Sequence, residues 1–175
     1  NKKMPIPNQD LASWQSFPDW MIANWVNQFG KSKTNKLIDY LNQSHGTDLR
    51  INLPIDKVES RLLDQGISWS NSPNSKNFIR INSGLRKILS SQIHLSGKVF
   101  VQNRAAGAVV EILNPKPSET ILDVCAAPGT KSIYIFQKMN QSGNLFASDI
   151  NSSQVAKSFK RCNELELSID WKVKD

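Results

Sequence analysis

The spacing of apolar residues along the chain predicts a mixture of helices and strands. Recurrence every three to four residues predicts helices at residues 18–30, 34–44, 54–65, 103–113, 130–139 and 152–165. Alternation, or short apolar runs between turn residues, predicts strands at residues 49–53, 67–69, 78–81, 99–101, 120–124, 145–149 and 169–173. The fold class is therefore α/β, with a small βαββαβ-like sheet followed by strand–helix units that are typical of a parallel sheet.

This order of elements predicts three parts: a helical lead-in at residues 1–46, a small α+β domain at 47–102, and the first half of a parallel sheet with its helices at 103–175. The lead-in helix has an apolar stripe of Trp14, Phe17, Met21, Trp25 and Phe29. Aromatic residues can stack on bases, but their spacing of three and four favours a core. In helix 103–113, the residues expected to face the sheet are Ala106, Val109, Val110 and Leu113.

The segment Thr120–Asp149 contains the candidate chemistry. An apolar strand ends at Asp123 and Val124, a turn follows, and a helix leads to a second strand that ends at Asp149. Ligands of open α/β sheets bind outside the carboxyl ends of the strands, and a helix N-terminus favours an anionic group. Asp149 stands 20 residues after Gly129, where an acid can accept both hydroxyls of a ribose.

The turn excludes two kinds of nucleotide site. A dinucleotide fingerprint needs three glycines, whereas Gly129 is alone between Asp123 and Lys138. A Walker phosphate loop needs glycine directly before Lys-Ser, where this chain has Thr130. A small-residue turn without a phosphate cradle favours an adenosine ligand that lacks phosphates, of which S-adenosylmethionine is the commonest.

Composition and charge add a second expectation. The chain has 175 residues, a net charge of +7 and 39% hydrophobic residues, as expected of a soluble globular protein. Residues 1–103 hold 13 Lys and Arg against 7 Asp and Glu, so the positive charge is concentrated in the front half, as in a module that faces a polyanion. Two cysteines in different settings give no disulfide framework, which favours the cytoplasm. We expect a monomeric protein that has no membrane-spanning segment and no metal site.

Several motifs resemble the Sun family of RNA cytosine-5 methyltransferases. The sequence Asp-Val-Cys-Ala-Ala-Pro-Gly-Thr-Lys at residues 123–131 is similar to its first motif, Asp-x-Cys-Ala-Ala-Pro-Gly-Gly-Lys-Thr. Leu-Arg-Ile-Asn at residues 49–52, Phe-Val-Gln at 100–102 and Phe-Pro-Asp-Trp at 17–20 resemble family segments in the same order. The resemblance implies a Rossmann-like methyltransferase sheet that binds S-adenosylmethionine, and RNA as substrate, with rRNA ahead of tRNA.

The resemblance also implies the cofactor-binding residues, which are Cys125, Ala126, Ala127, Pro128, Gly129, Thr130, Lys131, Asp149 and Asp175. Asp149 would bind the ribose or, alternatively, cap the helix that begins at Ser152. Asp123 would organise the turn and face the methionine ammonium, or be a buried structural acid. Lys131 would balance the methionine carboxylate or lie in solvent. Thr130 replaces the second glycine of the family motif, and its Cβ hinders close approach of the backbone to a ligand.

RNA is expected to contact Lys and Arg residues of the front half through its phosphates. The candidates are Lys31, Lys33, Lys36, Arg50, Arg80, Arg86 and Lys87. The aromatic motif with which RNA-recognition sheets stack bases is absent, so stacking on the sheet face is not expected.

The resembled family adds a cysteine thiolate to C6 of cytosine, so that C5 can attack the sulfonium methyl group. Its cysteines follow Asp-x-Pro and Thr/Ser after the third strand, and this chain has no Pro-Cys pair. Cys125 lies within the cofactor turn, and Cys162 falls on an apolar helix face, so neither is expected to be the nucleophile. No residue of this chain is therefore expected to be catalytic. It would be the front part of the enzyme, or alternatively a non-catalytic adenosine- or RNA-binding remnant.

We therefore predict that these 175 residues alone do not transfer a methyl group to RNA, because they supply no thiolate for C6. Incubation with RNA and S-adenosylmethionine labelled on its methyl group tests this. Label in the RNA would refute the prediction.

Overall fold

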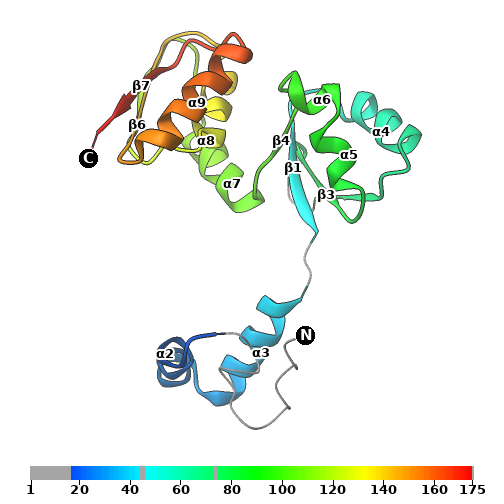
Figure 1. The fold of residues 1–175 in the computed structure, drawn as a ribbon, viewed down its shortest axis with the longest axis vertical. Helices are drawn as coiled ribbons and strands as arrows, with labels where there is room; N and C mark the ends of the chain where they lie inside the picture. Colours follow the sequence, from blue (N-terminus) through cyan, green and yellow to red (C-terminus); the bar gives the residue numbers. More distant parts are fainter. Residues whose placement is uncertain (1–16, 44–45, 73–74, 175) are drawn as a thin grey trace. The chain divides into compact units, whose positions relative to one another are not determined.

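The computed structural model describes residues 17–43, 46–72 and 75–174 (Figure 1). The chain forms two compact units, Asn1–His45 and Gly46–Asp175. The finer division into residues 47–102 and 103–175 stays a prediction. Trp14 and Asp175 lie outside the described residues.

The first unit is a pair of helices, α2 (Asp19–Phe29) and α3 (Lys31–Asn42). Gly30 joins them with a φ of 78°, a conformation that glycine adopts readily and that lets α3 begin at once. Ile22 and Ile38 are buried between the helices, and Phe17 and Trp25 pack edge to face beside them. Phe17 and Trp25 of the predicted stripe therefore pack against the core, but Phe29 is 44% exposed, so its predicted place in the core is wrong.

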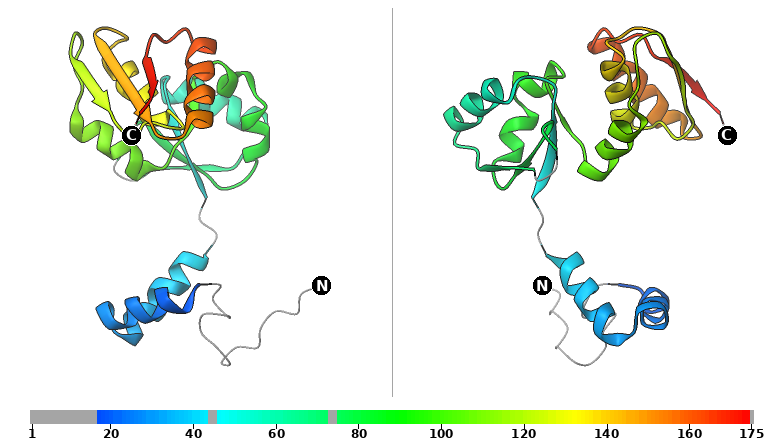
Figure 2. Two further views of the ribbon diagram at one scale, coloured as in Figure 1. Left: turned by 60° about the vertical axis from the view of Figure 1, so that its left-hand side comes forward. Right: turned by 180° about the vertical axis from the view of Figure 1, so that it is seen from behind.

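The second unit begins with a four-stranded antiparallel sheet in the order β2-β3-β1-β4. Its elements are β1 (Thr47–Ile51), α4 (Ile55–Asp64), β2 (Trp69–Asn71), β3 (Phe78–Ile81), α5 (Leu85–Leu89), α6 (Gln92–Leu95) and β4 (Val99–Val101). Alternate residues of β1, including Leu49 and Ile51, point to one face and are buried with side chains of α4, α5 and α6. Figures 1 and 2 show these three helices on that side of the sheet.

The chain continues into a parallel sheet in the order β5-β6-β7. Its elements are α7 (Arg104–Leu113), β5 (Thr120–Asp123), α8 (Thr130–Lys138), β6 (Asn144–Asp149), α9 (Ser152–Glu164) and β7 (Asp170–Val173). The connections β5-α8-β6 and β6-α9-β7 join neighbouring parallel strands in the same order across the sheet. Because such connections are right-handed, α8 and α9 lie on the same face of the sheet, as Figures 1 and 2 show. On the opposite face Leu122 and Phe146, which are paired across β5 and β6, are 64% and 38% exposed.

The two sheets of this unit share one core. The second face of the antiparallel sheet contributes Phe78 and Phe100, which are buried together with Val110 of α7 and Tyr134 of α8. Helix α7 approaches the sheet at Gly107, where an added Cβ would lie 2.1 Å from Cζ of Phe78.

The predicted orientation of helix 103–113 is only partly right. Val110 is buried, as predicted, but Val109 and Leu113 are 57% and 50% exposed. The sequence pattern failed here because the closest contact is made by Gly107, a residue without an apolar side chain.

The predicted fold class is confirmed: a small α+β sheet precedes a Rossmann-like parallel sheet. Most predicted elements agree with the observed ones within two or three residues. The strand predicted at 67–69 is displaced to β2 because Ile67 packs in the helix-covered core before the strand begins. Among the described residues, no helix is both long and apolar enough to cross a membrane.

Replacement of Gly107 by alanine should destabilise this unit. Alanine is favoured over glycine within a helix by about 1 kcal/mol, but overpacking of a full core typically costs about 1–3 kcal/mol. Phe78 is only 2% exposed, and its ring would have to shift to admit the added methyl group. We expect a lower free energy of unfolding in urea, with the exposed change Val109→Ala as a control that alters it by less than about 0.5 kcal/mol. Equal or greater stability of Gly107→Ala would contradict the packing described.

Candidate cofactor site at the carboxyl ends of the parallel strands

Two carboxylates lie at the carboxyl ends of adjacent parallel strands. Asp123 ends β5 and Asp149 ends β6, and the register pairs Asp123 with Ala147, so Asp149 extends two residues further. Residues 124–129 connect β5 to α8 and pass between these acids. This segment is called the bend below.

Asp149 points at the bend. Its Oδ2 accepts a hydrogen bond from the backbone N–H of Ala127 at 3.1 Å, and its Oδ1 accepts one from the N–H of Asn151 at 3.0 Å. The alternative that Asp149 caps the following helix is wrong, because the side chain of Asn151 accepts from the N–H of Gln154 and is the cap of α9. Asp149 is half-buried and remains partly accessible.

Asp123 holds the bend from the other strand. Its Oδ1 accepts from the N–H of Cys125 at 3.3 Å, and its Oδ2 accepts from the hydroxyl of Ser132 at 2.8 Å. Ser132 is fully buried in the first turn of α8. The carboxylate therefore ties the end of β5 to the start of α8, which is the organising role that the sequence indicated. The role of Ser132 was missed, because a serine in an amphipathic segment has no distinctive pattern.

Gly129 adopts a backbone conformation in the bend that favours glycine. Its φ of 94° lies in the left-handed region, and a Cβ would come within 3.2–3.3 Å of Trp171 on β7 and Ser158 on α9. The peptide bond between Ala127 and Pro128 is cis. Thr130, by contrast, does not adopt a positive φ, because α8 begins there. The conformation that needs glycine therefore falls on Gly129 and not on Thr130.

The remaining predicted residues of the bend differ in exposure. Ala126 is buried and its N–H bonds to the carbonyl of Ser148 at 3.0 Å, whereas Cys125 and Pro128 are exposed. Lys131 is half-buried in the first turn of α8. Asp175, the last predicted cofactor residue, lies outside the described residues. All the other predicted cofactor residues lie on or beside the bend.

Two exposed apolar side chains flank the acids, and sequence reasoning missed both. Val124 follows Asp123 and is 69% exposed, and Ile150 follows Asp149 and is 70% exposed. The sequence feature that could have identified them is that each directly follows a strand-end acid. Large apolar side chains left in solvent at a ligand-binding edge can cover the flat face of a purine ring.

The two cysteines have different surroundings. Cys162 is 1% exposed, and burial raises the pKa of its thiol, an effect that the Trp171 indole partly offsets. A buried thiol with a raised pKa is a poor nucleophile, which agrees with its predicted place in the core. Cys125 is exposed within the bend. Within residues 17–43, 46–72 and 75–174, no group of His, Cys, Asp and Glu could hold a metal ion.

The residues predicted to contact RNA fall into two groups. Those exposed at the surface are Lys31, Lys33 and Lys36 on α3 and Arg86 and Lys87 on α5. The two arginines of the small sheet differ from these exposed residues, because Arg80 is half-buried and Arg50 is buried. Arg80 forms an ion pair with Asp48 at 3.0 Å. Arg50 is fully buried and cannot reach a phosphate, so its prediction as an RNA contact is wrong. Alternation along a strand shows which residues share a face, but not whether water or a second layer covers that face.

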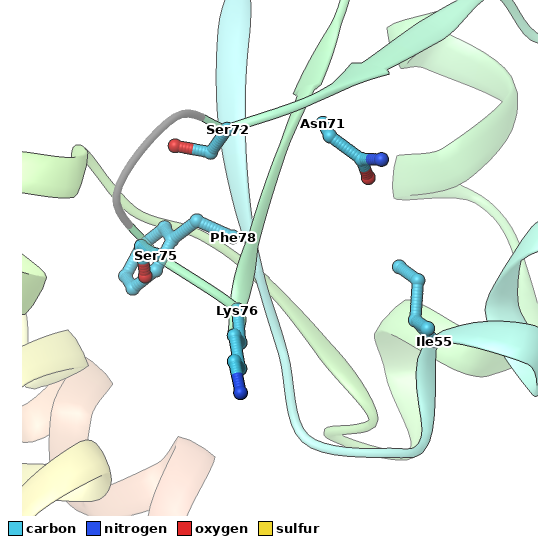
Figure 3. Close-up of a pocket in the computed structure, with 6 residues that line it drawn as sticks. All are labelled: Ile55, Asn71, Ser72, Ser75, Lys76 and Phe78. Atoms are coloured by element: carbon cyan, nitrogen blue, oxygen red, sulfur yellow. The ribbon is translucent and has the colours of Figure 1, made fainter.

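A separate open hollow of about 650 Å³ lies on the small sheet (Figure 3). Its described lining residues are Ile55, Asn71, Ser72, Ser75, Lys76 and Phe78. Figure 3 shows the side chains of Asn71, which ends β2, and of Ser72, which follows it, pointing to opposite sides of the chain. None of the described lining residues is acidic, so they offer no carboxylate to a ribose.

Comparison with known proteins agrees with this geometry. Residues 110–174, which contain the bend and both acids, match the family described as 16S rRNA methyltransferase RsmB/F. A probable ribosomal RNA small subunit methyltransferase B of Synechocystis sp. is 35% identical over 142 residues, which are 79% of this chain and 32% of that protein. The corresponding protein of Bacillus subtilis is 29% identical over 93% of this chain and 37% of its own length. The chain thus spans about a third of these relatives.

Solved structures show the same fold. A methyltransferase homologue protein from Pyrococcus horikoshii superposes with a TM-score of 0.80 at 18% identity, over 94% of this chain and 55% of its own. NSun6 from Pyrococcus horikoshii, solved with SFG, gives a TM-score of 0.81 at 14% identity, over 92% of this chain and 66% of its own. The solved structures show the shared fold, whereas the matched residues 110–174 and the relative from Synechocystis sp. show that the chain belongs to the family described as 16S rRNA methyltransferase RsmB/F.

Proposed function

We propose that the bend and its two acids bind S-adenosylmethionine, and that the chain is the cofactor-binding front part of an RNA cytosine-5 methyltransferase. The observation that carries this proposal is the position of Asp149, which ends β6 and points at the bend. An acid at this place can accept the hydroxyl groups of a ribose. The cofactor would supply the methyl group, and the residues of this chain would hold and orient it.

The carboxylate of Asp149 keeps enough acceptor capacity for a ribose. An ionised carboxylate has about four lone-pair sites on its two oxygens, and the N–H groups of Ala127 and Asn151 use one on each oxygen. The same bonds fix the orientation of the carboxylate before a ligand arrives. Ile150 would then lie against one face of the adenine, because it is exposed directly beyond the acid.

The start of α8 is suited to the other end of the cofactor. The first N–H groups of a helix have no partners within the helix, and the helix dipole makes this end positive. Lys131 adds a positive charge in the first turn. We assign this end to the methionine carboxylate and the Asp123 side to the methionine ammonium, as the family resemblance implied.

The substrate that we propose is rRNA. The matched family and the two bacterial relatives carry rRNA in their names, as does a 28S rRNA (cytosine-C(5))-methyltransferase of Mus musculus that is 26% identical over 84% of this chain and 19% of its own length. A tRNA is the second candidate, because a human tRNA (cytosine(72)-C(5))-methyltransferase is 42% identical over 34% of this chain and 13% of its own length.

Cofactor binding can be tested by calorimetry on the 175-residue chain. Asp149→Ala should lower the affinity for S-adenosylmethionine at least tenfold, because it removes the acceptor of the ribose hydroxyls and releases the N–H of Ala127. Asp170→Ala is the matched control, since Asp170 begins β7 at the opposite end of the same sheet and should leave the affinity unchanged. Equal affinities of the Asp149→Ala and wild-type chains would remove Asp149 from the site.

RNA contact can be tested through its dependence on salt. Each phosphate contact contributes about 0.7 to 0.9 to the slope of log K against log salt concentration. Replacement of Lys31, Lys33 and Lys36 by alanine should therefore weaken binding to an rRNA fragment and lower the slope by about 2 to 3. The matched control replaces the exposed residues Lys157, Lys160 and Lys174 of the parallel-sheet segment. Equal slopes for the two triple variants would show that α3 makes no specific contribution.

A further inference from the structure

Arg50 is a fully buried arginine at the junction of the two sheets. It lies on β1, opposite Phe100 in the register, and its guanidinium carbon is 4.4 Å from the centre of the Phe100 ring and 4.2 Å from that of Tyr134. The guanidinium is thus held between two aromatic faces, which attract a cation. Burial lowers the pKa of Arg50 to about 9, so it is still charged at neutral pH.

The hydrogen bonds of Arg50 connect two segments that are far apart in the sequence. Its Nε donates to Oε1 of Gln102, just after β4, at 2.6 Å. One of its terminal nitrogens donates to Oε1 of Gln137 on α8 at 2.7 Å. Tyr134 and Gln137 lie three residues apart and share one face of α8, so a single guanidinium holds this face.

The aromatic partner is itself fixed. The hydroxyl of Tyr134 donates to Glu111 of α7, which also accepts from Lys138 at 3.0 Å. The amide of Asn77 donates to the same hydroxyl at 3.1 Å. The face of α8 that contacts Arg50 therefore has little freedom to slide.

Helix α8 transmits this position to the bend. It begins at Thr130, directly after Gly129, and Ser132 in its first turn donates to Asp123. Ser132–Phe136 are all buried, so the helix is enclosed around its whole circumference. A rotation or slide of α8 would move Ser132 away from Asp123 and the bend away from Asp149.

We propose that Arg50 is a positioning residue of the cofactor site: by clamping Tyr134 and Gln137 it sets α8, and through α8 the conformation of the bend that receives S-adenosylmethionine. This inference rests on the proposed cofactor function. It assigns a role in methyl transfer to an arginine that touches neither cofactor nor RNA.

Three variants separate positioning from general stability. Arg50→Met removes the donors, and Arg50→Lys keeps the charge but cannot bond to both glutamines from one plane. Arg104→Gln is the control for loss of a partly buried arginine in the same unit. Arg104 bonds to Asp48 at 3.2 Å and to Ser72 at 3.2 Å, neither of which is on α8.

The first measurement is amide hydrogen exchange in the absence of cofactor. The N–H groups of Ala126 and Ala127 donate to Ser148 and Asp149 of β6, and that of Gly129 donates to the carbonyl of Ala126. The N–H groups of α9 report on the unit as a whole. In Arg50→Met the bend amides should exchange at least tenfold faster relative to α9, with a smaller change in Arg50→Lys and none in Arg104→Gln. Unchanged relative exchange in Arg50→Met would overturn the proposal, whether or not the chain binds a cofactor.

The second measurement is the affinity for S-adenosylmethionine by calorimetry, below the melting temperature of each variant. Arg50→Met should bind at least tenfold more weakly than wild type, and Arg104→Gln within twofold. Wild-type affinity in Arg50→Met would overturn the proposal while leaving the cofactor site intact. If the wild-type chain binds no cofactor, the proposed function fails, and hydrogen exchange still decides the role of Arg50 in shaping the bend.

Discussion

The candidate site depends on two strand-end carboxylates that grip one short connection. Asp123 accepts from Cys125 in the bend and from Ser132 in α8, and Asp149 accepts from Ala127 in the bend and from Asn151, so the strand ends hold both the bend and the start of the helix that follows it. Each carboxylate accepts from backbone or hydroxyl groups, and such bonds to charged acceptors are stronger than neutral ones. The bend is therefore shaped before any ligand is present.

The bend also depends on how closely its neighbours approach. Gly129 lies close to Trp171 of β7 and Ser158 of α9, and a Cβ at this position would be in tight contact with both. On the other side, α8 is enclosed and begins directly after the bend, so any movement of this helix would displace the bend. A site of this kind is sensitive to residues that never touch the ligand, because the supporting layer holds the groups that do.

The junction of the two sheets links the small α+β sheet to the cofactor side of the molecule. Phe78 and Phe100 of the antiparallel sheet enter the same core as α7 and α8, and Arg50 brings a charge into that core. A buried cation is costly unless it is compensated. Two glutamine oxygens accept from Arg50 and two aromatic rings cover its guanidinium, whereas its second terminal nitrogen is buried without a hydrogen-bond partner among the described residues. The family segment around Leu49–Asn52 thus has a structural meaning in this chain: its arginine connects β1 to α8 and is not exposed to solvent.

The sequence by itself determined the order of elements, the α/β class, the position of the bend and the two acids that frame it. These follow from local patterns: apolar runs, a lone glycine and an acid at the end of each strand. Only the tertiary structure decided that Arg50 is inside, that Ser132 and Ile150 belong to the site, and that α7 packs through Gly107 and not through Val109. The physical reason is that a side chain's environment is set by residues distant in sequence, so the same alternating strand fits either a wet face or a second layer.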